Sequence, residues 1–225
     1  MISVVIPTLN AAGVLGETLA SLSRARAEIP LEIIVADGGS VDDTALIAER
    51  DGTILIEAPR GRGRQLARGA QAASGDWFLF LHADTRLAPS WSQAAGAFAA
   101  DPRNRRRAGY FRFRLDDTGW SVRVLEATVL WRCRVLALPY GDQGLLISRG
   151  FYEELGGYRA VPLMEDVDLV RRIGRRRLRA LPARAVTSAE KYRRDGYLIR
   201  PLRNLLCLGL YSVGVPPRYI ESIYR

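Results

Sequence analysis

Short apolar runs alternate with helix-like segments through the first 81 residues, and this alternation restricts the fold more than any other feature of the chain. The runs have the length of strands that are buried on both faces of a sheet. They predict strands at residues 2–7, 31–36, 53–57 and 76–81. Strands that alternate with helices form βαβ units. The sequence therefore predicts an α/β fold with a mixed, mainly parallel sheet and a first half in the style of nucleotide-binding proteins.

The second half of the chain has a less regular pattern. Helices are predicted at residues 91–100, 121–136, 151–155 and 165–173, and strands at residues 110–115, 143–148 and 178–182. Residues 202–215 are apolar and predicted to be helical, but this run is too short for the roughly 18 residues that a membrane span needs. Trp120 and Trp131 are expected to pack rather than to stack on a sugar, although Trp120, beside Gly119, could do either.

Composition narrows the class of protein. With 225 residues and 48% hydrophobic content, the chain can bury a full core, which argues against disorder and for one domain. The net charge of +9, almost all from arginine, favours phosphates, nucleic acid or a membrane surface as partners. Cys133 and Cys207 lie far apart and the chain has one histidine, which argues against a thiolate zinc site and for a reducing compartment. No secretory signal is recognised at the start.

Polar side chains follow three of the predicted strands. Thr8 and Asn10 follow the first strand, Asp37 the second, and His82 and Asp84 the fourth. Carboxyl ends of parallel strands share one edge, so these residues are expected to meet in one crevice. A divalent cation that bridges a carboxylate and a diphosphate would explain an acidic crevice in a basic protein, and oxygen ligands suit Mg²⁺ or Mn²⁺. The alternative is that both aspartates only stabilise turns; the metal-site interpretation is favoured, more strongly for Asp84.

Arginine and glycine alternate over residues 60–64, just before a predicted helix. The segment contains Gly-x-Gly, but Leu66 occupies the third glycine position, so it is not a dinucleotide fingerprint. A single short copy inside an α/β pattern, without interleaved aromatic residues, also argues against RNA binding. Arginines at this position favour contact with a phosphate or a base.

Five motifs in order resemble those of family 2 glycosyltransferases of the GT-A fold. They are VVIPTLN at residues 4–10, VADGGSVDDT at 35–44, SGD at 74–76, LHAD at 81–84, and GGY at 156–158 followed by EDVDL at 165–169. The resemblance runs from residue 2 to about residue 175. The details GRGRQL, LHADT and LPYGDQG resemble the small bacterial subgroup labelled arsenosugar-biosynthesis-like.

The resemblance implies a role for each matching position on the donor side. Thr8, Asn10 and Asp37 would hold the nucleotide, and Arg64 would contact the base or the diphosphate. His82-Ala83-Asp84 would stand for the Asp-x-Asp motif of the family, with Asp84 as the metal ligand. His82 replaces the first acid of that motif and would lie toward the ribose or the sugar.

On the acceptor side, the resemblance implies that Asp166, with Glu165, is the general base of an inverting transfer. The alternative is two acids that favour a helix N-terminus through the helix dipole. Tyr140, Asp142 and Gln143 would line the acceptor side, or belong to an ordinary loop. Processive relatives carry Gln-x-x-Arg-Trp where this chain has residues 191–194, so processive polymer synthesis is not expected. Arg193 and Arg194 are expected to be solvated rather than to clamp a diphosphate.

Together these features predict a cytoplasmic, inverting glycosyltransferase that uses a nucleotide-diphosphate sugar, with a UDP-sugar favoured, Mn²⁺ or Mg²⁺ as cofactor, and no nucleic acid partner. The predicted GT-A domain covers residues 1–190, with a nucleotide-binding half up to about residue 86 and an acceptor half from about 87 to 190. A helical tail covers residues 191–225.

Three questions stay open at the level of sequence. The acceptor is a small molecule or a lipid. Residues 198–215 form a helix that packs on the domain, joins a dimer, or lies peripherally on the inner face of the membrane. A sugar-1-phosphate nucleotidyltransferase is a second candidate, disfavoured by the missing glycine- and lysine-rich opening, and an inactive nucleotide-sugar sensor is a third.

Overall fold

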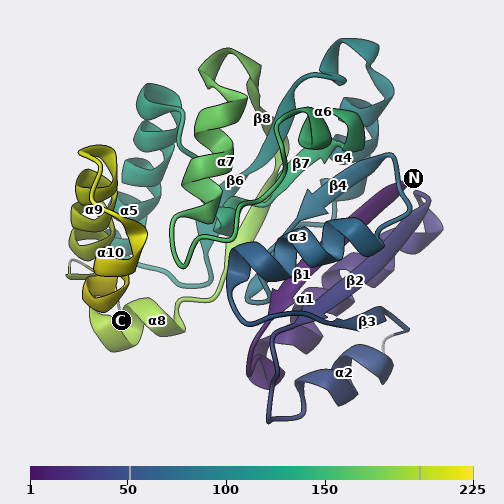
Figure 1. Ribbon diagram of the computed structural model, residues 1–225, viewed down its shortest axis with the longest axis horizontal. Helices are drawn as coiled ribbons and strands as arrows, with labels where there is room; N and C mark the ends of the chain where they lie inside the picture. Colours follow the sequence, from purple (N-terminus) through teal and green to yellow (C-terminus); the bar gives the residue numbers. More distant parts are fainter. Residues whose placement is uncertain (51, 198, 225) are drawn as a thin grey trace.

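The computed structural model describes residues 1–50, 52–197 and 199–224, and one mixed sheet organises them (Figure 1). The sheet has eight strands in the order β3-β2-β1-β4-β7-β6-β8-β5. In chain order they are β1 Ile2–Thr8, β2 Leu31–Asp37, β3 Ile54–Glu57, β4 Trp77–Phe80, β5 Thr85–Leu87, β6 Ala108–Leu115, β7 Leu145–Ser148 and β8 Leu178–Thr187.

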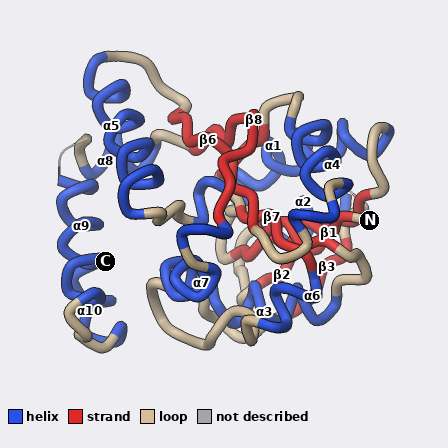
Figure 2. Tube along the Cα trace, turned by 90° about the horizontal axis from the view of Figure 1, so that it is seen from above, coloured by secondary structure: helices blue, strands red, loops and turns tan. Residues whose placement is uncertain are grey.

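Helices cover both faces of this sheet (Figure 2). The α-helices are α1 Ala12–Ser23, α2 Thr44–Arg50, α3 Arg62–Ala72, α4 Trp91–Ala100, α5 Trp120–Trp131, α6 Arg149–Glu154, α7 Glu165–Ile173, α8 Glu190–Asp195, α9 Ile199–Ser212 and α10 Pro217–Tyr224. The shorter turns are η1 Arg24–Ala27, η2 Pro102–Asn104, the π-helical η3 Arg132–Leu136, η4 Gly141–Gln143 and η5 Arg175–Arg177.

The first four strands are all parallel, as the alternating pattern predicted. β1 pairs with both β2 and β4, and β2 pairs with β3. Thr8 at the end of β1 lies opposite Asp37 at the end of β2, so these two strand ends meet at one edge of the sheet. Beyond β4 the direction changes, because β7 is antiparallel to both β4 and β6, while β8 is parallel to β6 and antiparallel to β5.

Two hydrophobic layers lie on opposite sides of the sheet. Val4 and Ile6 of β1 belong to the layer under α1 and α4, whereas Val5, which alternates with them, belongs to the layer under α3, α5 and α7. These three side chains are fully buried. Each contributes about 1.5–3 kcal/mol by leaving water, which is why short uninterrupted apolar runs suffice to fix the strands.

Strand β8 is longer than the sequence pattern predicted. The predicted strand ended at Pro182, a residue that cannot donate a hydrogen bond to a neighbouring strand. In the structure β8 continues to Thr187, and its pairing with β6 shifts register between Tyr110 and Arg112, opposite the proline. An irregularity at this point removes the need for the missing N–H. The three-residue strand β5 was also not predicted, whereas α8, α9 and α10 form the predicted helical tail.

The expectation that Trp120 and Trp131 pack rather than stack on a sugar is not met for packing, since both side chains lie largely in solvent. Both lie on α5, and their exposed fractions are 80% and 56%. The helix instead buries the face that carries Val122, Leu125 and Val129, roughly half a turn away around the axis. The predicted helix over residues 121–136 is observed as α5 followed by the π-helical turn η3.

The C-terminal segment forms two helices that pack on the rest of the protein. The predicted helix over residues 198–215 corresponds to α9, and Leu198 lies outside the described residues. Cys207 and Leu208 of α9 and Ile220 of α10 are buried in the same layer as α5 and α7. Among the described residues, no helix combines the length and the apolar character that a membrane span requires.

Candidate active site

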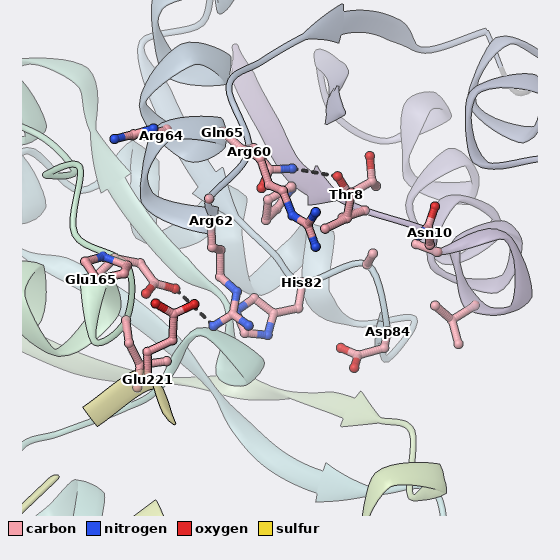
Figure 3. Close-up of a pocket in the computed structure, with 18 of the residues that line it drawn as sticks. Thr8, Asn10, Arg60, Arg62, Arg64, Gln65, His82, Asp84, Glu165 and Glu221 are labelled. Atoms are coloured by element: carbon pink, nitrogen blue, oxygen red, sulfur yellow. Dashed lines mark hydrogen bonds and ion pairs between the residues drawn. The ribbon is translucent and has the colours of Figure 1, made fainter. Parts of the chain in front are cut away.

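A cavity of about 1230 Å³ opens at the carboxyl ends of β1 and β4 (Figure 3). Its walls come from the loops after these two strands, the start of α3, the segment that leads into α7, and α10. The polar residues in the wall are Thr8, Asn10, Arg60, Arg62, Arg64, Gln65, His82, Asp84, Ser188, Glu165, Glu190 and Glu221. Open α/β sheets bind ligands at this edge, so the cavity is the candidate active site.

Asp37 holds together the loops that follow β1 and β2. Its Oδ1 accepts a hydrogen bond from Thr8 Oγ1 at 2.8 Å, and its Oδ2 accepts from the backbone N–H groups of Gly39 and Ser40 at 3.0 and 2.7 Å. Burial alone would raise the pKa of this carboxyl, but hydrogen bonds from Ser40, Thr8 and Gly39 hold it below its usual value. Thr8 lines the cavity, whereas Asp37 does not. Asp37 therefore reaches the predicted crevice only through its hydrogen bond with Thr8.

Asn10 joins the same two loops in a left-handed backbone conformation, with φ of 50°. Its backbone N–H donates to Ser40 Oγ at 2.8 Å, and its side-chain Oδ1 accepts from the N–H of Val41 at 2.9 Å. Asparagine tolerates this conformation better than most residues, which explains the residue type at this turn. Asn10 lines the cavity as well.

The alternation of glycine and arginine at the start of α3 has a steric cause. A Cβ atom on Gly63 would lie 2.4 Å from the carbonyl oxygen of Arg159 and 3.3 Å from Cβ of Glu165. Glycine therefore allows the first turn of α3 to touch the segment that leads into α7. The arginines on either side of the glycines, Arg60, Arg62 and Arg64, line the cavity.

Gln65 connects this turn to the sheet. Its Nε2 donates to the carbonyl oxygens of Thr8 and Ala36 at 2.6 and 3.0 Å, and the side chain is buried. It thereby satisfies two backbone acceptors where β1 and β2 end. No sequence pattern indicated this role, because the two acceptors belong to the main chain.

Glu165 forms a buried ion pair with Arg62. Arg62 Nη1 lies 3.0 Å from Glu165 Oε1, and the exposed fraction of the Glu165 side chain is 1%. Burial raises the pKa of Glu165 above its usual value, although the Arg62 guanidinium opposes that shift. The pair joins α3 to α7 across 103 residues of sequence, and Arg62 was not predicted as a site residue.

The loop after β4 carries His82 and Asp84, and both residues line the cavity. The loop is fixed through its main chain, since the Ala83 carbonyl accepts from Thr18 Oγ1 at 2.7 Å and the Asp84 carbonyl accepts from the N–H of Ser188 at 3.1 Å. The His82 ring packs against Gly141, where a Cβ atom would lie 2.3 Å from Nε2. His82 thus connects the loop after β4 to the turn η4.

Asp166 is held by the same turn. Its Oδ2 accepts a hydrogen bond from the N–H of Gly141 at 2.9 Å, and its Oδ1 accepts from the N–H of Val167 at 2.7 Å. Asp166 does not line the cavity, whereas its neighbour Glu165 does. Gly141 therefore lies between Asp166 and His82 and contacts both.

The three predicted acceptor-side residues lie behind this wall rather than in it. Tyr140 packs under the Arg132 guanidinium, with 3.4 Å between its ring centre and Cζ. Gln143 is buried, with its Nε2 donating to the Phe111 carbonyl at 3.1 Å and its Oε1 accepting from Arg132 Nη2 at 3.2 Å.

Asp142, behind this wall, keeps one carboxylate oxygen without a hydrogen bond from the part of the chain that the structure describes. Its Oδ1 is buried and has no hydrogen-bond partner among the described residues. Burial raises the pKa of Asp142 to about 6; the Arg132 guanidinium opposes this, and the carboxylates of Asp166 and Asp84 add to it.

The sequence matches the glycosyl transferase family 2 profile over residues 3–138, which is more than half of the chain. This protein belongs to glycosyl transferase family 2. The predicted family is thereby confirmed, and the matched residues contain the motifs at residues 4–10, 35–44, 74–76 and 81–84.

Two curated relatives of this family member come from Mycobacterium tuberculosis. The PGL/p-HBAD biosynthesis glycosyltransferase is 38% identical over 94 residues, which cover 39% of this chain and 36% of the relative. Glucosyl-3-phosphoglycerate synthase is 33% identical over 92 residues, which cover 37% of this chain and 28% of the relative. The chain thus spans about a third of the length of the curated relatives it matches.

Solved structures extend the likeness to most of the chain. S. aureus TarS 1–349 in complex with UDP has a TM-score of 0.61 at 17% identity, covering 99% of this chain and 69% of TarS. Glucosyl-3-phosphoglycerate synthase from M. tuberculosis, in complex with Mn²⁺ and UDP-glucose, has a TM-score of 0.59 at 22% identity, covering 84% and 69%. The mannosyltransferase PcManGT from Pyrobaculum calidifontis, in complex with GDP-Man and Mn²⁺, has a TM-score of 0.63 at 20% identity, covering 90% and 59%. These likenesses confirm the predicted fold.

The donor set of this family 2 site fits a metal ion that is shared with a substrate. Within the described residues, no group of three or more His, Cys, Asp or Glu side chains is arranged to hold a metal. Asp84 supplies a carboxylate to a cavity lined by arginines. Mg²⁺ usually takes one or two carboxylates together with substrate phosphates, so a site with one protein carboxylate suits a cation bound jointly with a diphosphate.

Proposed function

We propose that this protein transfers a sugar from a nucleoside diphosphate sugar to an acceptor with inversion at the anomeric carbon. The observation that carries the proposal is the composition of the cavity. Arginines that suit a diphosphate and the Asp84 carboxylate line it together, and the Glu165–Asp166 pair starts the helix beside it. A phosphate-binding region beside carboxylates is what displacement of a diphosphate by a hydroxyl requires.

The donor would bind at the ends of β1 and β2. Thr8, Asn10 and Asp37 are proposed to hold the nucleotide, with Asp37 preorganised as an ionised acceptor by the hydrogen bonds that lower its pKa. Arg64, with Arg60, is proposed to contact the diphosphate. A UDP-sugar is favoured because TarS and glucosyl-3-phosphoglycerate synthase are both complexed with uridine nucleotides. A GDP-sugar is the alternative, because PcManGT is complexed with GDP-Man.

Asp84 is the residue that would hold Mn²⁺ or Mg²⁺, and the bound cation would neutralise charge on the departing diphosphate. His82, on the same loop, is proposed to contact the ribose or the sugar. Its ring is backed by Gly141, so its position depends on the turn η4. The contact between His82 and Gly141 would align the donor sugar with the wall that carries Asp166.

Asp166 is proposed as the general base. The N–H of Gly141 donates to its Oδ2, which fixes the carboxylate while leaving it lone pairs to accept a proton. In the reaction the acceptor hydroxyl gives its proton to Asp166, its oxygen bonds to the anomeric carbon, and the bond from that carbon to the diphosphate oxygen breaks on the opposite face. Glu165 would position this residue, since its ion pair with Arg62 anchors the start of α7.

Tyr140, Asp142 and Gln143 are proposed to support the acceptor side from behind the cavity wall. The acceptor is proposed to be a small molecule or a lipid. Both cysteines are free and buried, which supports a cytoplasmic location.

A thermal-shift panel of UDP, GDP, TDP and CMP, each with and without Mn²⁺, tests the donor proposal. A ligand that binds only the folded state raises the melting temperature. We expect UDP with Mn²⁺ to give the largest rise and Asp84→Ala to remove the Mn²⁺-dependent part. An equal response to all four nucleotides, unchanged by Mn²⁺, would contradict the proposal.

The second candidate function, a sugar-1-phosphate nucleotidyltransferase, is tested by incubation with nucleoside triphosphates and a sugar 1-phosphate. Release of pyrophosphate would establish that reaction and exclude the proposed one. An inactive sensor predicts a third result, in which nucleotide binding persists while neither donor hydrolysis nor transfer occurs.

A further inference from the structure

Two helices at one end of the molecule expose large apolar side chains in addition to those that they bury. Figures 1 and 2 both place α5 beside α9, at the end of the sheet away from α2 and β3. The inner faces of the two helices contribute Val122, Leu125, Cys207 and Leu208 to one hydrophobic layer. Contiguous exposed apolar side chains mark sites of contact with a protein or a membrane, so the outer faces are candidates for such a contact.

The outer face of α5 carries two tryptophans. Trp120, Val124 and Trp131 are separated by four and seven residues, which puts them on one side of the helix. All three are exposed, and the exposed apolar surface continues through Val135 and Leu136 in the turn η3. Tryptophans with this exposure are typical of surfaces that meet an interface between water and an apolar phase.

The outer face of α9 adds a second apolar stripe. Leu202, Leu205 and Leu206 are spaced as i, i+3 and i+4, and their exposed fractions are 64%, 60% and 53%. The inward side chains Cys207 and Leu208 lie on the other side of the helix. Single exposed apolar residues are common on protein surfaces, but three neighbouring exposed leucines form a patch.

The charges around this surface are mainly positive. Arg123 and Arg134 are exposed on α5 and η3, and Arg200 and Arg203 belong to α9, which contains no acidic residue. The single acid of α5, Glu126, is paired with Arg114 at 2.6 Å. Arg175 donates to the carbonyl oxygens of Val135 and Arg134 at 3.2 and 3.3 Å, which brings the exposed arginines of η5 to the end of η3.

We propose that the α5–α9 face, defined by Trp120, Trp131, Leu202, Leu205 and Leu206, docks on the surface of a lipid bilayer that contains anionic lipids. Apolar side chains enter the boundary between headgroups and acyl chains, and arginines at the rim meet anionic headgroups. A two-fold dimer through this face would oppose the same arginines from both copies, so charge favours the bilayer over a second copy.

The position of the α5–α9 face affects how an acceptor would reach the active site. This inference rests on the proposed function. The element that follows α9 is α10, which supplies Glu221 to the cavity wall and Ile220 to the core. A bilayer bound at α9 would therefore adjoin the segment that borders the active site. An acceptor carried by a lipid would reach the cavity from that side.

Vesicle co-sedimentation of the full chain tests the proposal. We expect the protein to pellet with vesicles of phosphatidylglycerol and phosphatidylcholine in equal parts, to bind phosphatidylcholine vesicles less, and to be released by high salt. Leu202→Glu/Leu205→Glu and Trp120→Ala/Trp131→Ala should each weaken binding to anionic vesicles by roughly tenfold or more. Leu46→Glu is the matched control, because Leu46 is an exposed leucine on α2, and should bind as wild type does.

Melting temperatures of the variants without vesicles show whether each one folds, and the tryptophan pair keeps the test valid if the glutamate pair does not. Equal binding to neutral and anionic vesicles, or unchanged binding by folded variants of both pairs, would overturn the proposal. So would light scattering that gives a wild-type dimer and a monomer for Leu202→Glu/Leu205→Glu. The nucleotide panel in solution reports the proposed function separately, because it contains no lipid.

Discussion

The two sides of the cavity are built in different ways. The proposed donor side is made by neighbouring parallel strands, where Thr8 and Asp37 stand opposite each other in the β1–β2 register and share a hydrogen bond. The proposed acceptor side is assembled from segments far apart in sequence, through the Arg62–Glu165 ion pair and the hydrogen bond from Gly141 to Asp166. The donor side is thus a property of the sheet, whereas the acceptor side depends on a few long-range contacts.

Activity should respond most strongly to Asp166, the residue that the long-range contacts position. Asp166→Asn keeps a hydrogen-bond acceptor for Gly141 but removes the base, and general-base catalysis is typically worth 10²–10⁴-fold, so we expect kcat for transfer to a hydroxyl acceptor to fall by about that factor. Nucleotide binding, which belongs to the donor side, should be unchanged in the thermal-shift panel.

Transfer to an acceptor that is already ionised, such as a lipid phosphate, provides the control for this variant. A phosphate oxygen needs no base, so Asp166→Asn should spare that reaction much more. If the variant instead loses nucleotide binding together with transfer, Asp166 supports the whole site and is not its base.

The same difference explains what the sequence could predict. Strands β1 to β4 and the polar residues after them were predicted because each depends on a local pattern and on the shared edge of parallel strands. Arg62 and Gln65 were missed because their partners, Glu165 and two main-chain carbonyls, leave no local pattern. Asp142 and Gln143 were predicted to line the acceptor side, and no pattern indicated that they would lie behind the cavity wall.

Stability should respond next most strongly to the ion pair that joins the two sides. Arg62→Ala leaves the buried Glu165 without its partner, and breaking a buried pair costs about 3–5 kcal/mol, with the lower end expected here because Arg62 keeps some contact with solvent. Urea unfolding measures this change. Glu165→Gln in the Arg62→Ala background should restore part of the loss, since it removes the unpaired charge.

The direction of the pH dependence sharpens this prediction. Burial already raises the pKa of Glu165, and removal of Arg62 removes the group that opposes the rise. The stability that comes from a raised pKa is present at low pH and is lost as the pH rises through the folded-state value. The Arg62→Ala variant should therefore lose more stability, relative to wild type, in mildly alkaline than in mildly acidic buffer; an equal loss at both would mean that Glu165 is not the source.

Asp142 offers a similar test inside the acceptor wall. Its folded-state pKa of about 6 lies above its usual value of 3.8, so the native state holds this proton more tightly than the unfolded chain does. The stabilisation is complete below pH 3.8 and is lost as the pH rises through about 6, by an amount of up to about 3 kcal/mol. Asp142→Asn stays neutral and should be more stable than wild type above that pH, by urea unfolding in the presence of EDTA. Parallel stability curves for the two proteins would contradict the assignment.

The contact between α3 and the segment that leads into α7 is expected to give the smallest effect. Gly63→Ala would put a Cβ atom 2.4 Å from the Arg159 carbonyl oxygen, and because that atom belongs to the main chain the two segments must separate, at a cost of about 1–3 kcal/mol. Gly16→Ala is the matched control, since a Cβ atom at this helical position in α1 meets nothing within 4 Å and should stabilise by up to about 1 kcal/mol. If both variants are stabilised in urea unfolding, α3 and α7 are not held in contact at Gly63. If Gly63→Ala is destabilised and also lowers kcat, while the nucleotide-induced thermal shift stays intact, the acceptor side depends on this contact and the donor side does not.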